Sequence, residues 1–129
     1  MFQVETQERT QVVDVTEKVR DELQGQNVSD GLCTVFVQHT TAGVVVNEAE
    51  SGLLEDIESF LQNIVPDHDD YRHDRIDDNA DSHLRALLLG ESATVPIEDG
   101  ELALGTWQKL LFVECDGPRT RRVRVTVTD

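Results

Sequence analysis

The sequence is poor in basic residues, and above all in lysine. It has 11 lysines and arginines against 26 aspartates and glutamates, which gives a formal net charge of −15, and only Lys18 and Lys109 are lysines. Nucleic-acid backbones and anionic membrane surfaces carry the same sign of charge, so this balance excludes a general nucleic-acid binder and a membrane-surface protein. An acidic surface with so few lysines resembles that of a halophilic protein from a high-salt cytoplasm, where salt screens the self-repulsion.

The sequence also has no long apolar run and few cysteines. No stretch approaches the roughly 18 to 20 apolar residues that cross a bilayer, and residues 1–5 show no basic segment followed by a hydrophobic one. We therefore expect no membrane association and a cytoplasmic location. The two cysteines, Cys33 and Cys115, each lie in an alternating apolar run and belong to no CxxC pair. This placement favours core filling over a metal ligand or a redox pair.

The rest of the composition is that of a folded protein, with 129 residues of which 38% are hydrophobic. This length predicts one domain, residues 1–129. Strands are expected within 2–15 (two short ones), 32–39, 44–46, 93–97, 102–104, 107–115 and 121–128, and helices over 16–24, 48–65 and 81–89. This order indicates an α+β fold with a mainly antiparallel sheet or sandwich and two to three helices, in which one sheet face is free for another subunit.

A polar turn follows the buried strand that is expected to end at His39. Thr40 and Thr41 come directly after this histidine, and Gly43 follows two residues later. The hydroxyl groups and free backbone amides of such a turn can bind an oxyanion, and the imidazole can transfer a proton. The alternative is a turn in which the threonine hydroxyls bind only their own backbone.

Two further histidines can reach the same place. His83 falls in the first turn of a predicted helix, where the helix dipole favours the neutral imidazole that acts as a base or a metal ligand. His73 lies on the loop between the second and third predicted helices. We therefore expect His39, His73 and His83 to bind one divalent metal ion, with zinc favoured and one position open for water or a phosphate oxygen. The alternative is acid–base catalysis by an imidazole pair without metal.

A group of arginines near the end of the sequence stands out in so acidic a chain. Arg119 follows a Gly-Pro turn, and Arg121 falls on the apolar face of the last predicted strand. A guanidinium group there needs an anionic partner, so both arginines are expected to bind phosphate oxygens. The alternative is an internal salt bridge to Glu114 or Asp116. Glu114 lies on a mostly apolar strand face and is expected to act as a general base toward a metal-bound water, or to orient a histidine.

Five segments, taken in order, resemble the YjbQ-like family, which is often labelled secondary thiamine-phosphate synthase. They are HTTAGVVVNE at 39–48, YRH at 71–73, NADSHL at 79–84, LGTWQ at 104–108 and ECDGPR at 114–119. The resemblance implies a small α+β domain that forms a trimer with a pocket near subunit boundaries. It also implies weak thiamine-phosphate synthase activity, in which a pyrimidine diphosphate is joined to a thiazole phosphate with loss of pyrophosphate. The residues carried over are His39, Thr41, His73, His83, Glu114 and Arg119.

Two functions are consistent with these residues. The first is a metal-assisted enzyme that acts on phosphorylated small molecules, with His39, His83 and Glu114 as catalytic residues. Its phosphate-binding residues are expected to be Thr40, Thr41, Gly43, Arg119 and Arg121. The alternative is a non-catalytic homotrimer that binds an anionic metabolite in the same pocket or serves as a scaffold for a partner. Convergent histidines together with a carboxylate exceed what anion binding requires, which favours the enzyme.

Overall fold

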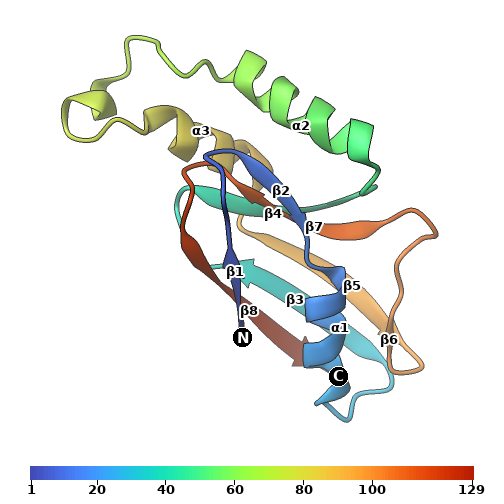
Figure 1. Cartoon of the computed structure of the whole chain (residues 1–129). Coiled ribbons are helices and arrows are strands. Elements are labelled where there is room, and N and C mark those ends of the chain that lie inside the picture. Colours follow the sequence, from blue (N-terminus) through green and yellow to red (C-terminus); the bar gives the residue numbers. More distant parts are fainter.

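The computed structural model describes residues 1–129, which form eight strands and three α-helices (Figure 1). The strands are β1 (Phe2–Glu5), β2 (Gln11–Asp14), β3 (Gly31–Val37), β4 (Ala42–Asn47), β5 (Ser92–Glu98), β6 (Glu101–Leu102), β7 (Lys109–Glu114) and β8 (Thr120–Thr128). The helices are α1 (Thr16–Gln24), α2 (Ser51–Ile64) and α3 (Ala80–Leu89), with a 3-10 turn η1 (Arg72–Arg75). The predicted α+β class, with mainly antiparallel strands and two to three helices, is confirmed, and the number of α-helices is three.

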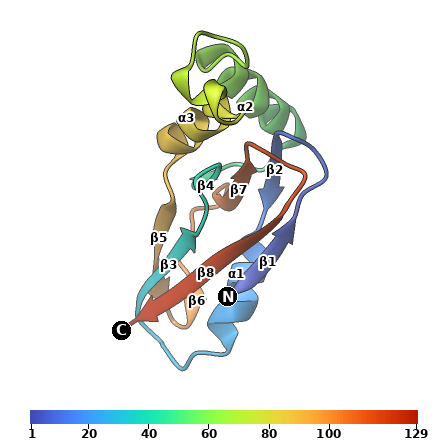
Figure 2. The ribbon, with the colours of Figure 1, turned by 90° about the vertical axis from the view of Figure 1, so that its left-hand side faces the viewer.

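The strands form two antiparallel sheets that face each other (Figure 2). The larger sheet has the order β1-β8-β3-β5-β6, and the smaller sheet has the order β2-β7-β4. In the larger sheet β8 pairs with β1 on one side and with β3 on the other. Helices α2 and α3 lie together on the far side of the smaller sheet, as Figure 1 shows. The layers are therefore the larger sheet, the smaller sheet and the helix pair.

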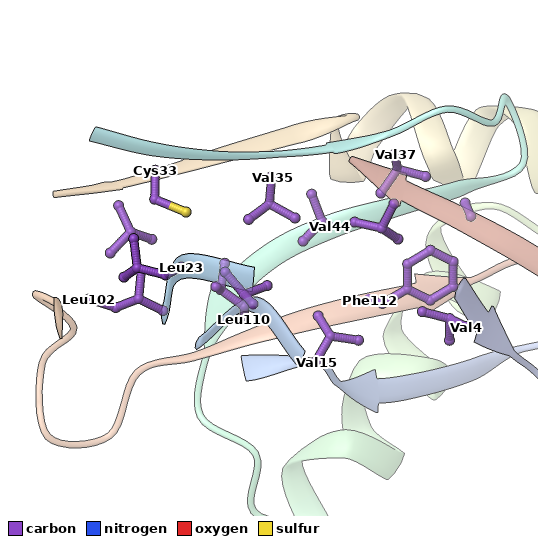
Figure 3. Packing of buried hydrophobic residues seen from close by; sticks show 14 of the residues in the cluster. Val4, Val15, Leu23, Cys33, Val35, Val37, Val44, Leu102, Leu110 and Phe112 are labelled. Carbon is purple, nitrogen blue, oxygen red and sulfur yellow. The ribbon is translucent and has the colours of Figure 1, made fainter. Parts of the chain in front are cut away.

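The main hydrophobic core lies between the two sheets and includes one face of α1 (Figure 3). Alternate residues of β3, namely Cys33, Val35 and Val37, point into it together with Phe112 of β7. Each large apolar side chain buried in this way contributes about 1.5–3 kcal/mol of hydrophobic stabilisation. A smaller core between β7 and α2 contains Cys115. Both cysteines are free and buried, which confirms that they fill the cores.

No helix covers the outer face of the larger sheet. There β3 exposes Leu32 and Phe36, whose accessibilities are 48% and 40% of the full value. Neighbouring β8 directs Arg122 and Arg124 to the same side, because these residues alternate with the buried Arg121 and Val123 of the strand. The free sheet face that the sequence predicted is present, and its contact with another subunit stays a prediction.

Several element boundaries differ from those that the sequence predicts, each for a local reason. Helix α2 begins at Ser51 instead of at 48, because the Glu50 carboxylate accepts hydrogen bonds from the amides of the first turn. Strand β7 begins at Lys109 instead of at 107, because Gly105 and Gln108 close a turn through two hydrogen bonds of 2.8 and 3.1 Å. None of the helices has the length and the apolar character that crossing a membrane requires.

Candidate functional site

An open cavity of about 720 Å³, which we call the main cavity, lies where the end of β3, the β7–β8 turn and the start of β8 approach the N-terminal end of α3. Its lining is mainly polar. Of the nine site residues that the sequence predicts, six line this cavity: His39, Thr40, Thr41, His83, Arg119 and Arg121. The other three, Gly43, His73 and Glu114, lie outside its lining.

Beneath the main cavity, Glu114 of β7 and Arg121 of β8 form a buried ion pair, with side chains 0% and 4% exposed. Arg121 Nε donates a hydrogen bond to Glu114 Oε1 (2.8 Å), and its Nη2 donates to Oε2 and to Thr41 Oγ1 (2.9 Å). Glu114 also accepts hydrogen bonds from Thr6 Oγ1 (2.8 Å) and from the backbone amide of Asp116 (3.0 Å). This pair is the internal salt bridge that the sequence left open for Arg121.

These contacts decide the charge of Glu114. Burial by itself raises the pKa of this carboxyl group, but the hydrogen bonds from Arg121, the Asp116 amide and Thr6 outweigh burial and hold the pKa below its usual 4.5. The carboxylate is therefore ionised at neutral pH, and both of its oxygens are occupied. In this setting Glu114 does not face the cavity as a general base, but holds Arg121 in place.

Arg119 reaches the main cavity from the β7–β8 turn, and Asp116 orients it. Its Nε donates to the Asp116 backbone carbonyl (2.8 Å) and its Nη2 to Asp116 Oδ2 (3.0 Å). The same Oδ2 accepts a hydrogen bond from Asn79 Nδ2 (2.9 Å), and Asn79 Oδ1 lies 3.0 Å from His73 Nε2. Because the amide nitrogen of Asn79 faces a carboxylate, its oxygen faces His73, which is therefore the donor. No hydrogen bond occupies Nη1 of Arg119.

His39 follows β3 and forms part of the cavity wall. Its Nε2 accepts a hydrogen bond from the backbone amide of Arg122 (2.8 Å). A backbone amide only donates, so the proton of the neutral ring lies on Nδ1. Burial and the nearby Arg121 guanidinium lower the pKa of His39, and Glu114 opposes them by a smaller amount. At neutral pH the ring is therefore uncharged and carries an N–H group that can donate to a ligand.

Helix α3 places the half-buried His83 at the cavity, and a buried network fixes this helix. Arg85 is 0% exposed, and its Nε donates a hydrogen bond to the Val65 carbonyl (3.1 Å) at the end of α2. Its Nη1 lies 3.0 Å from Asp81 Oδ2, with which it forms an ion pair. Asp81 in turn accepts two hydrogen bonds of 2.9 Å from Arg9 in the β1–β2 loop. The position of His83 is therefore set by three connected parts of the chain.

Gly43 has a packing role inside β4, where it pairs with Val113 of β7. A Cβ atom at this position would lie 2.7 Å from the Gly90 carbonyl oxygen and 2.8 Å from Leu89 Cβ. Only glycine therefore allows β4 to approach the end of α3 so closely. The structure does not place Gly43 where a phosphate group in the main cavity would lie, as the sequence had predicted.

Residues 1–129 match the family model described as UPF0047 protein YjbQ-like. The chain belongs to the YjbQ-like family. Among its relatives, a UPF0047 protein of Archaeoglobus fulgidus is 52% identical over 122 residues, which are 95% of this chain and 94% of that protein. A UPF0047 protein of Methanothermobacter thermautotrophicus is 49% identical over 122 residues, which are 95% of this chain and 85% of that protein.

Solved structures with the same fold support this membership in the YjbQ-like family. A hypothetical protein of Aeropyrum pernix K1 superposes with a TM-score of 0.96 at 45% identity, over 98% of this chain and 95% of that chain. A YbjQ-like protein of unknown function from Sulfolobus solfataricus superposes with a TM-score of 0.95 at 38% identity, over 98% of this chain and 92% of that chain. The fold of the YjbQ-like family is therefore shared along nearly the whole chain.

The metal site predicted for this YjbQ-like protein is not formed within the chain. The rings of His73 and His83 are in edge contact, with centroids 4.7 Å apart. His39 lines the main cavity with His83, whereas His73 does not, and the Nε2 atoms of His39 and His73 are both engaged in the hydrogen bonds described above. No three histidine, cysteine, aspartate or glutamate side chains are positioned to hold a metal ion. Metal binding stays a prediction.

Five acidic or amide residues of the cavity are not assigned to the site by the sequence analysis: Gln38, Asp77, Asn79, Glu91 and Asp116. Asn79 and Asp116 stand inside two of the five YjbQ-like segments, so the motifs carried a signal for them. Gln38, Asp77 and Glu91 stand outside those segments, and a single amide or an exposed carboxylate in so acidic a chain gives no signal by itself. Only the folded chain shows that they face the same cavity.

Proposed function

We propose that this YjbQ-like protein binds a phosphorylated small molecule in the main cavity and acts on it as an enzyme. The observation that supports this best is the convergence of Arg119, the Thr40-Thr41 turn and two histidines on one cavity, from three separate parts of the chain. A pocket with a few convergent polar groups is the usual form of a ligand site.

Each of these residues has a distinct role in the proposal. Arg119 binds phosphate oxygens through its free Nη1, while Asp116 holds the guanidinium plane. The Thr40 hydroxyl donates to the same phosphate group. His39 donates its Nδ1 proton to a substrate oxygen, and His83 transfers a proton to or from the substrate.

The reaction to assay first is the one that the family resemblance implies, the joining of a pyrimidine diphosphate and a thiazole phosphate with loss of pyrophosphate. Negative charge grows on the leaving pyrophosphate, and preorganised donors such as Arg119 and the His39 N–H group stabilise such charge. Glu114 supports the site from below as a positioning residue. A divalent metal stays a predicted cofactor, and no step is assigned to it, since the histidines do not form its site within the chain.

Turnover of phosphate esters and thiamine precursors by the purified protein tests this proposal, with the metal content of the same sample measured. His83→Asn should lower kcat by about 10²- to 10⁴-fold and leave substrate binding in place. His68→Asn is the matched control, because His68 is exposed and lines neither the main cavity nor its neighbours. Equal kcat values for the parent and His83→Asn would exclude the role of His83.

Binding is tested separately through Arg119. Arg119→Lys keeps the charge and loses the planar fork, so Kd for phenyl phosphate should rise about tenfold. Arg20→Lys, on α1, is the control and should leave Kd unchanged. Ligand binding without any turnover would favour the alternative, a non-catalytic protein that binds an anionic metabolite in the same cavity.

We also propose that the chain forms a homotrimer. The uncovered outer face of the larger sheet, with Leu32 and Phe36 exposed on it, supports a contact between subunits. Light scattering at ~1 M salt should give about three times the chain mass of 14.5 kDa. A monomeric mass would contradict the proposal.

A further inference from the structure

The charges around the main cavity do not suit a ligand that is only an anion. Its two arginines are already paired, Arg121 with Glu114 and Arg119 with Asp116. Two more carboxylates, Asp77 and Glu91, line the same cavity, and neither forms a salt bridge. Among the charged side chains of the lining, the carboxylates Asp77, Glu91 and Asp116 outnumber the two arginines, so a bound phosphate compound needs a positive group to offset them.

A second cavity of about 340 Å³, which we call the side cavity, opens beside the first. Four residues line both cavities and therefore lie at their junction: His39, Thr40, His83 and Glu91. The side cavity is otherwise walled by apolar side chains of β4 and α3, namely Ala42, Ala86 and Leu87. A ligand held at Arg119 can thus extend past the two histidines into an apolar recess.

The chemistry of the side cavity suits an uncharged ring. Leu87 is 77% exposed, so a ring that covers it removes apolar surface from water. At about 340 Å³ the side cavity has room for a six-membered ring, although it is open to solvent on one side. Glu91 at its edge can accept a hydrogen bond or an ion pair from a nitrogen group on such a ring.

We propose that the ligand of this site has three parts: a phosphate group at Arg119, an uncharged ring in the side cavity, and a positively charged nitrogen group that Glu91 binds. This inference rests on the proposed function, since the phosphate end is its anchor. It narrows the substrate class to phosphorylated ring compounds with a basic nitrogen, and it assigns Glu91 a role in specificity.

Three probes separate these parts in titrations at neutral pH: inorganic phosphate, phenyl phosphate and O-phosphotyramine, which carries a phosphate and an ammonium group on one ring. Phenyl phosphate should bind about tenfold more tightly than phosphate, because its ring is buried. O-Phosphotyramine should gain a further factor of about five from one partly exposed ion pair. Glu91→Gln should remove only this second gain, while Glu98→Gln, an equal charge change at the other end of β5, should leave all three affinities unchanged.

The outcomes distinguish this inference from the proposed function. If no probe binds, or if Arg119→Lys changes no affinity, the phosphate site itself is refuted. Two results would refute only the three-part ligand while phosphate binding still depends on Arg119. The first is that phenyl phosphate binds no more tightly than phosphate. The second is that O-phosphotyramine binds no more tightly than phenyl phosphate, or that Glu91→Gln does not remove the difference. Leu87→Gln should weaken phenyl phosphate binding without changing the mass in light scattering. A changed mass would show that another copy of the chain covers Leu87, which would overturn the assignment of the side cavity.

Discussion

Replacing Glu114 by glutamine should destabilise the protein far more than the same change at an exposed carboxylate such as Glu98. The substitution removes the negative charge that offsets Arg121, whose side chain is 4% exposed. It also puts an amide NH2 group where the carboxylate accepted hydrogen bonds from Thr6 or the Asp116 amide. Removing one partner of a buried ion pair costs about 3–5 kcal/mol. For a domain of this size, such a loss lowers Tm by about 10–20 °C. It is also a large share of the about 5–15 kcal/mol by which such domains are stable.

Urea unfolding of Glu114→Gln, followed by far-ultraviolet circular dichroism, measures this loss. Glu98→Gln serves as the control, since Glu98 is exposed on β5. The double variant Glu114→Gln/Arg121→Met should recover at least half of the lost stability, because it leaves no unpaired buried charge. If the single variant lost less than about 1 kcal/mol of its free energy of unfolding, the Glu114–Arg121 pair would not be what stabilises the chain beneath the main cavity.

The same pair gives the direction of the acid dependence. The pKa of Glu114 lies below its usual 4.5 in the folded chain, so protons bind more readily to the unfolded chain. The ionised Glu114 therefore contributes its full share of stability when the pH is above the pKa of the unfolded chain. This contribution disappears as the pH falls through the lower pKa of the folded chain. The parent should lose this part of its stability in acid, whereas Glu114→Gln, which cannot titrate there, should not.

Three more predictions concern stability and packing. Gly43→Ala should cost about 1–3 kcal/mol, because its Cβ would lie 2.7 Å from the Gly90 carbonyl, whereas Gly25→Ala, with 3.6 Å to its nearest neighbour, should cost little in the same urea titration. Tm should rise between ~0.1 M and ~1 M salt as the screening length falls from about 10 to 3 Å around a chain of net charge −15, and a Tm independent of salt would contradict this. Burial raises the pKa of Cys115 to about 12, so iodoacetamide at mildly alkaline pH should label this thiol only after unfolding, and rapid labelling of the native protein would show that it is accessible.

Most of the fold could be predicted from the sequence because its signals are local. The alternation of Cys33, Val35 and Val37 indicates a strand with one buried face, and the structure buries those three residues. Boundaries were less accurate where one side chain decides them, as at Glu50, whose carboxylate caps α2. The pairing of β8 with both β1 and β3 has no local signal, since it joins opposite ends of the chain.

The site could be predicted only in part, because residue types do not show which partner a charged group finds. The sequence identified Arg121 as a cation on an apolar strand face, yet phosphate and an internal carboxylate satisfy such a cation equally well. Only the fold shows that Glu114, on β7 of the other sheet, accepts hydrogen bonds from Nε and Nη2 of Arg121. The loop position of His73 predicts that it joins the other histidines, and its ring does lie against His83. Its Nε2, however, binds Asn79, and His73 does not line the main cavity.

The pairing of Arg119 with Asp116 affects both affinity and geometry. A free arginine on this acidic surface would bind any nearby carboxylate, including those of other molecules, and would pay rotamer entropy on binding a ligand. Asp116 accepts hydrogen bonds from Nε and Nη2 of Arg119. Because the guanidinium group is planar, these two bonds also fix the direction of the free Nη1. The bond also offsets the positive charge, so a bare phosphate gains little Coulomb energy here. In the proposed site, selectivity must therefore come from the other parts of the ligand, which lie at the junction residues His39 and Glu91.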